Sequence, residues 1–347
     1  MKVVQSSRQS RVAGVAFLLL VLVLLTAPMW ASRGHISLLI EFFYFLALAE
    51  IWNLLAGFAG IVSLGQQAFL GLGGYALFFV TMHWQWNPVL SLIFAAVAGG
   101  VIAIPVTLVV FRLHGAYLAI GTWVVAEVFK LVFSDINSLG AGSGISLPSS
   151  VAHAVNFGSF SRNTVLYCIA LAVALLSILC AYALLRSQVG LELSAIRDDE
   201  KAARSAGVNS FRIKLLVFIA AGAATAMTGA LIYLSKLRIS PGSAFDINWT
   251  SYIIFIVVIG GLGTLEGPMV GAIVYFVLRQ YLSDLGSWYL IVLGAVAVAV
   301  MLKMPSGIWG TLAKRYSLSL FPTQRRLVFS EEDLLPGQQT VDAALTR

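Results

Sequence analysis

Long apolar runs separated by short polar stretches organise this chain, and they predict helices that cross a membrane. About 20 consecutive apolar residues span a bilayer as a helix, and about ten runs approach this length by the same criterion. The predicted spans cover residues 12–30, 36–56, 58–82, 89–111, 115–134, 164–186, 215–235, 250–264, 268–283 and 288–303. The pattern therefore predicts an all-α polytopic membrane protein.

The composition agrees with this interpretation and excludes a soluble globule. Hydrophobic residues make up 59% of the 347 residues and charged residues only 11%, whereas a soluble domain carries about 25% charged residues. The net charge of +7 comes from Lys and Arg that flank apolar runs and form no continuous basic stripe, so nucleic-acid binding is not indicated.

The distribution of Lys and Arg predicts which side of the membrane each segment occupies, since cytoplasmic segments are enriched in both. With the N-terminus inside, the cytoplasmic segments collect Lys2, Arg8, Arg11, Arg112, the six basic residues of 186–214, Lys303, Lys314, Arg315, Arg325, Arg326 and Arg347. The outside receives only Arg33, Arg162, Lys236 and Arg238. Both termini are therefore expected in the cytoplasm.

This sidedness divides the chain into segments. We expect a cytoplasmic N-terminus over 1–11, a membrane domain over 12–303 and a mobile cytoplasmic tail over 304–347. Within the membrane domain, 135–163 is expected to be an external loop and 187–214 a cytoplasmic segment. The first run also has the shape of a signal sequence, although a retained span is favoured.

Two glycine-rich stretches interrupt the plain apolar spans. Residues 57–74 contain six glycines and residues 260–271 contain five. Glycine either lets helix backbones pack closely or marks a discontinuous helix whose free backbone groups line a polar pathway. The candidate pathway residues are Ser63, Gly65, Gln66, Gln67, Gly73, Gly261 and Gly263.

A few ionisable residues fall within predicted spans. Glu127 and Lys130 are three positions apart on one helix and are expected to pair. Glu41 and Glu50 lie half a turn out of phase, so they cannot both face one cavity. Glu50 is the deeper carboxylate, and it supports an alternative in which the chain is an ion-coupled secondary transporter.

No catalytic or cofactor motif is present. The sequence lacks G-x-x-x-x-G-K-[ST], so the chain has no phosphate-binding loop for ATP. Cys168 and Cys180 lie twelve positions apart in one apolar run, too far to form a disulfide on a helix. We therefore expect no enzyme activity, no bound cofactor and no metal in this chain.

Residues 186–214 form the longest densely charged stretch, with an amphipathic helix expected to begin near Ser194. It is either a polar loop that sets topology or a contact for a partner. Within it, Glu200 to Gly207 read E-x-A-A-x-x-x-G, which resembles the loop that permeases of ABC importers present to their ATPases. The stretches 195–218, 53–75, 239–272 and 112–128 resemble the permeases of branched-chain amino-acid ABC importers, in particular the longer of their two permease subunits.

This resemblance implies a subunit of the cell inner membrane that works with several partners. These are a second permease, two cytoplasmic ATPases that bind ATP and Mg, and an external solute-binding protein. The residues implied to contact the ATPase are Glu200, Ala202, Ala203, Arg204 and Gly207. Related permeases import urea or short amides, which leaves a second class of solute open.

Overall fold

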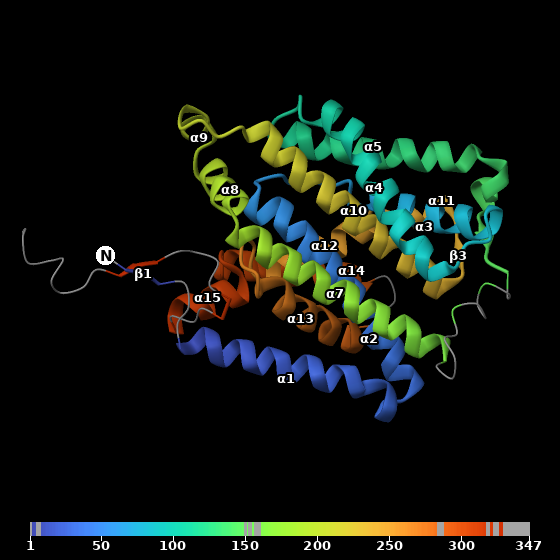
Figure 1. Cartoon of the computed structure of the whole chain (residues 1–347), viewed down its shortest axis with the longest axis horizontal. Helices are drawn as coiled ribbons and strands as arrows, with labels where there is room; N and C mark the ends of the chain where they lie inside the picture. Colours follow the sequence, from blue (N-terminus) through green and yellow to red (C-terminus); the bar gives the residue numbers. More distant parts are fainter. Residues whose placement is uncertain are drawn as a thin grey trace, which may run out of the picture.

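The computed structural model describes residues 2–4, 8–148, 151, 155, 161–282, 288–316, 320–321 and 326–328, with side chains between Val12 and Phe321. It is a bundle of long helices that run roughly along one direction (Figure 1). This architecture confirms the prediction of an all-α polytopic membrane protein.

The first part of the chain forms α1 (Arg8–Trp30), α2 (Arg33–Asn53) with a π-helical continuation η1 (Leu54–Phe58), α3 (Gln66–His83), α4 (Pro88–Val110) and α5 (Ala116–Asp135). Two short 3-10 turns follow, η2 (Asn137–Leu139) and η3 (Ala141–Ser143). The middle forms α7 (Arg162–Arg186), α8 (Gln188–Asp198), α9 (Glu200–Ser205) and α10 (Ser210–Lys236). The last part forms α11 (Pro241–Ala244), α12 (Asn248–Gly260), α13 (Gly267–Leu282), α14 (Trp288–Lys303) and α15 (Gly307–Tyr316).

Short antiparallel strand pairs join distant parts of the chain. β1 (Lys2–Val4) pairs with β4 (Arg326–Val328). β2 (Ile145–Ser146) pairs with β3 (Arg238–Ile239), with Ile145 opposite Ile239. The second pair attaches part of the predicted loop 135–163 to the end of α10, while residues 149–150, 152–154 and 156–160 of that loop lie outside the described residues.

Among the described residues, eight helical segments are long and apolar enough to cross a membrane. Each of the ten predicted spans contains a helix, but α3 and α13 are not among these eight. The predicted span 58–82 is wrong at its start, because α3 begins only at Gln66. The predicted span 250–264 ends early, at Gly260.

Small residues bring the central helices into backbone contact. α10 packs along both α3 and α4, and a Cβ atom at Gly73 would lie 1.8 Å from the carbonyl oxygen of Ala226. A Cβ atom at Gly229 would lie 2.1 Å from the carbonyl oxygen of Leu70. Close approach of this kind stabilises helix pairs by dispersion where lipid offers no hydrophobic driving force.

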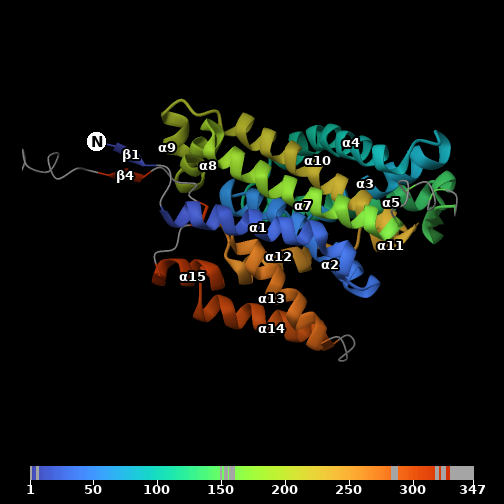
Figure 2. The ribbon, with the colours of Figure 1, turned by 60° about the horizontal axis from the view of Figure 1, so that its bottom comes forward.

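The bundle has two distinct ends (Figures 1 and 2). α8, α9 and α15 lie at one end, which we call the α9 end, and β3 and α11 lie at the other, the α11 end. The segment 304–347, predicted as a tail, begins with α15, which packs on α12 and α13. Its first part therefore belongs to the helical bundle.

Candidate functional site

The charged stretch at the α9 end folds as two short helices that meet at Asp199. α8 starts at Gln188, and Asp199 interrupts the helix with an extended backbone. The Asp199 carboxylate accepts hydrogen bonds from the backbone N–H groups of Lys201 (2.8 Å) and Ala202 (3.1 Å). The prediction of an amphipathic helix that starts near Ser194 is therefore wrong, because Asp199 caps a new helix within that range.

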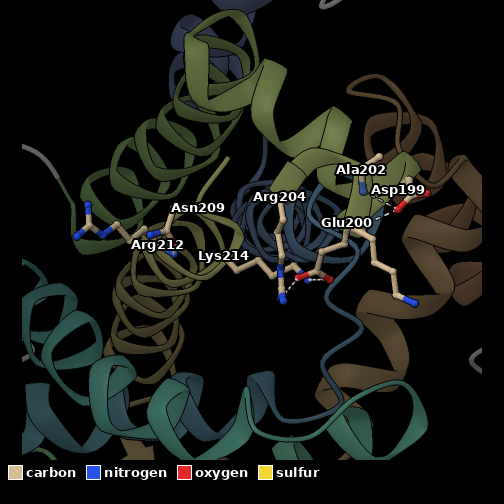
Figure 3. Close-up of polar contacts among 8 residues, drawn as sticks. Asp199, Glu200, Ala202, Arg204, Asn209, Arg212 and Lys214 are labelled. Carbon is tan, nitrogen blue, oxygen red and sulfur yellow. Dashed lines mark hydrogen bonds and ion pairs between the residues drawn. The ribbon is translucent and has the colours of Figure 1, made fainter. Parts of the chain in front are cut away.

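Glu200 joins α9 to the start of α10 (Figure 3). One carboxylate oxygen accepts from Arg204 and the other from Lys214, each at 2.7 Å. Partial burial of Glu200 would raise the pKa of this carboxyl group. The hydrogen bonds and positive charges of Lys214 and Arg204 outweigh burial and lower the pKa below its usual value. The carboxylate is thus held ionised between two cations on different helices.

A glycine ends α9 and sets the direction in which the chain leaves it. Gly207 has a φ of +89°, and its N–H donates to the Arg204 carbonyl at 3.0 Å. The N–H of Val208 donates to the Ala203 carbonyl at 3.1 Å. This is the Schellman pattern, which requires a left-handed residue and therefore favours glycine.

The two alanines of the E-x-A-A motif face different surroundings. Ala202 is exposed, whereas Ala203 is buried against the bundle. Ala203 therefore packs inward and does not contribute to the outer surface of α9. The exposed surface of α9 consists of Lys201, Ala202, Arg204 and Ser205.

A residue that the sequence motif did not single out connects this segment to the membrane helices. The guanidinium of Arg197 on α8 donates to the Gly57 carbonyl at 3.3 Å. Arg197 lies four residues after the buried Leu193, so one helical face carries both. This spacing is the signal by which the sequence could have indicated an inward contact for Arg197.

Gly57 lies where the two glycine-rich breaks meet. A Cβ atom at Gly57 would lie 2.5 Å from the backbone nitrogen of Gly263. The Asn53 amide completes the junction, because its oxygen accepts from the Gly263 N–H and its nitrogen donates to the Thr264 carbonyl, both at 2.8 Å. We call Asn53, Gly57, Gly263 and Thr264 the break junction. Gly261 and Gly263 have φ values of +137° and +76°, so both positions favour glycine.

The predicted polar residues of 57–74 are buried and contact other helices. The Gln66 side-chain oxygen accepts from Thr225 of α10 at 3.1 Å, and that of Gln67 accepts from Thr250 of α12. Ser63 is buried, and its carbonyl accepts from the Trp52 indole at 2.8 Å.

The glycines of this stretch meet neighbouring backbones. A Cβ atom at Gly65 would lie 2.0 Å from the Thr122 carbonyl oxygen, as Gly73 approaches Ala226. Close packing and a broken helix therefore occur together in 57–74.

The ionisable residues within spans form two pairs and leave one carboxylate alone. Glu127 and Lys130 lie 3.4 Å apart, which confirms the predicted local pair. Glu41 pairs with Arg279 at 2.6 Å. Glu50 is buried, and neither of its oxygens has a hydrogen-bond partner among the described residues. Within the described part of the chain, no cluster of His, Cys, Asp and Glu could hold a metal ion.

Comparison with known proteins places these features in a family. Residues 35–301 match the family described as branched-chain amino acid transport system, permease component. The high-affinity branched-chain amino acid transport system permease protein LivM of Escherichia coli K12 is 29% identical over an alignment of 320 residues, which covers 84% of this chain and 74% of that protein. The LivM protein of Salmonella typhimurium is 28% identical with the same coverage.

A second kind of permease is also similar to the chain. The high-affinity branched-chain amino acid transport system permease protein LivH of Escherichia coli K12 is 29% identical over 187 residues, covering 50% of this chain and 58% of that protein. No solved structure matches the chain.

Proposed function

The chain belongs to the family of branched-chain amino acid transport permeases, and from this premise we propose that it is the membrane-spanning subunit of an ATP-driven importer of branched-chain amino acids. The match to the family over residues 35–301 is the observation that carries the proposal. The chain is a translocation subunit and not an enzyme, so ATP hydrolysis takes place in partner subunits.

The importer that we propose has several components. The second permease is supported by the similarity of this chain to both LivM and LivH proteins. Two cytoplasmic ATPases bind ATP and Mg, and an external solute-binding protein delivers the amino acid. The complex lies in the cell inner membrane, with the α9 end and both termini on the cytoplasmic side.

The α9 end is the proposed contact for an ATPase. Ala203 packs α9 onto the bundle, Gly207 sets the direction in which the chain leaves α9, and the Glu200 contacts fix α9 to α10. The proposed contact residues are Glu200, Ala202, Ala203, Arg204 and Gly207. Movement of the ATPase then moves α8 and α9 together as a lever. The hydrogen bond from Arg197 to Gly57 transmits this movement to the break junction.

The break junction is the proposed site of rearrangement along the solute pathway. Gly261 and Gly263 supply backbone angles that other residues resist, and Gly65 and Gly73 let α3 slide against its neighbours. Ser63, Gln66 and Gln67 supply weak polar contacts for the passing solute. Since the binding protein has already selected the solute, these three residues need not form a tight site.

The proposal is tested by reconstituting the complete complex in liposomes and comparing two arginine variants. In Arg197→Ala the link to Gly57 is lost, so we expect solute-stimulated ATP hydrolysis and leucine uptake to fall about tenfold, a typical size for coupling between sites. Arg212→Ala is the matched control, because Arg212 points away from the Glu200 contacts (Figure 3). Assembly with the second permease and the ATPases should be unchanged in both.

Two outcomes would contradict the proposal. If the purified chain brings neither a second permease nor ATPases with it, the importer assignment fails. If leucine uptake collapses with an uncoupler and needs no ATP, the chain is an ion-coupled transporter of the kind that Glu50 would serve. If solute stimulates ATP hydrolysis equally in Arg197→Ala and Arg212→Ala, then Arg197 does not transmit the movement, and the rest of the proposal is unaffected.

A further inference from the structure

A polar cavity of about 270 Å³ lies at the α11 end of the bundle. Its charged lining comes from three helices and one connecting segment: Glu41 of α2, Lys236 of α10, Arg279 of α13 and Asp246 just before α12. Aromatic rings, among them those of Trp249 and Tyr275, form other parts of its wall. The cavity thus combines both signs of charge with aromatic walls.

Two of the charged groups already satisfy each other. Glu41 and Arg279 form an ion pair at 2.6 Å. Lys236 differs, since no described carboxylate lies within ion-pair distance of its ammonium group, which sits 4.8 Å from the centre of the Trp249 ring. Asp246 forms no ion pair among the described residues, and one of its oxygens accepts the Asn248 N–H at 2.9 Å. The cavity therefore presents one cation and one carboxylate whose charges remain available to a ligand.

We propose that this cavity binds the zwitterion of an α-amino acid with an apolar side chain. Lys236 binds the ligand carboxylate and Asp246 binds its ammonium group, while the apolar side chain packs against Trp249 and Tyr275. Charged groups enter a partly buried site only when each finds an opposite charge, and a zwitterion supplies both. The volume suits a single amino acid, since pockets for drug-sized ligands span about 300–1,000 Å³.

The position of the cavity agrees with a role in entry. It lies at the end opposite α9, so an amino acid released by an external binding protein reaches it before the break junction. This inference rests on the proposed function and names the site at which the solute first contacts the permease.

A larger cavity in the bundle lacks the chemistry for this ligand. It measures about 890 Å³ and lies between α1, α13 and α15. Glu266 is the one charged residue among those that line it, and its carboxylate accepts the Phe321 N–H at 2.8 Å. No cation from the described part of the chain lines this cavity, so it offers no charged partner for an amino-acid carboxylate.

The test compares two cations that lie two residues apart. Lys236→Gln removes the proposed carboxylate contact, and Arg238→Gln is the control because Arg238 is exposed at the same end but does not line the cavity. Retention of radiolabelled leucine is measured on the purified complex without binding protein, and uptake is measured in liposomes with it. We expect Lys236→Gln to weaken leucine retention and uptake about tenfold or more, as for a lost charge-assisted hydrogen bond. Arg238→Gln should match the unaltered complex.

A second variant separates loss of charge from loss of folding. Asp246→Asn removes the charge but keeps an oxygen that can accept the Asn248 N–H, so the local fold persists. We expect the same loss of leucine retention with normal assembly of the complex.

The outcomes distinguish a failure of the cavity assignment from a failure of the proposed function. If the unaltered complex takes up leucine and both cavity variants retain and transport it normally, the cavity is not the entry site and the proposed function stands. If the unaltered complex takes up no leucine, the proposed function fails and the cavity assignment fails with it.

Discussion

Glu200 illustrates how a single residue can orient two helices while adding little to stability. Its carboxylate holds Arg204 of α9 and Lys214 of α10 at 2.7 Å each. Partly exposed ion pairs contribute about 0.2–1 kcal/mol, which is too little to hold the bundle together. These ion pairs instead fix the orientation of α9 relative to α10 at the surface that we propose contacts the ATPase.

The lowered pKa of Glu200 predicts how this contact responds to acid. Because the folded pKa lies below the unfolded value of about 4.3, the contact stabilises α9 above that pH and the contribution is lost as pH falls through the folded pKa. We expect faster amide hydrogen exchange over 199–208 in Glu200→Gln at neutral pH, with the difference from the unaltered protein vanishing in acid. Glu192→Gln is the control, since Glu192 forms no ion pair among the described residues. A difference that is independent of pH would contradict the role of the Glu200 charge.

The contacts of single residues also show which features the sequence could predict and which it could not. The pair Glu127 and Lys130 lies within one helix turn, so its spacing alone predicts the contact. Arg197 and Asn53 contact residues 140 and 210 positions away, and no local pattern reveals such partners. The E-x-A-A-x-x-x-G motif located the exposed helix, but Arg197, which connects this segment to the break junction, lies three positions before that motif.

At the scale of elements, glycine predicted where helices break but not how the broken ends pack. Both glycine-rich stretches do interrupt helices, at 59–65 and at 261–266. The sequence predicted an amphipathic helix that begins near Ser194 and did not predict a break at Asp199. The extended backbone of Asp199 ends α8, and its side chain caps α9, which begins at Glu200.

Packing between α3 and α10 predicts a large difference between two glycine substitutions. A Cβ atom at Gly73 would meet the Ala226 carbonyl at 1.8 Å, whereas one at Gly294 has nothing within 4 Å. We expect Gly73→Ala to lower the free energy of unfolding by about 1–3 kcal/mol through overpacking. Gly294→Ala should leave it unchanged or raise it by up to about 1 kcal/mol through helix propensity. Unfolding in mixed detergent micelles measures both, and equal effects would show that α3 and α10 do not meet at Gly73.

At the scale of the whole molecule, the two ends of the bundle have different chemistry, as the proposed direction of transport would require. The α9 end carries an exposed, charged helix joined to the break junction through Arg197. The α11 end carries the cavity with Lys236 and Asp246. A solute that enters at the cavity therefore moves toward the end where ATP hydrolysis is proposed to act, with the break junction as the element that rearranges.

This arrangement predicts that the two ends face opposite sides of the membrane. In a background with Cys168 and Cys180 replaced by alanine, Ser205→Cys on α9 and Gly242→Cys on α11 each place one thiol at an exposed position. A membrane-impermeant maleimide applied to right-side-out vesicles should label Gly242→Cys at once and Ser205→Cys only after detergent is added. The distribution of Lys and Arg predicts this result, because it favours a cytoplasmic position for the α9 end. Reversed labelling would put the cavity on the wrong side for a solute arriving from outside, and it would overturn both the entry site and the ATPase contact.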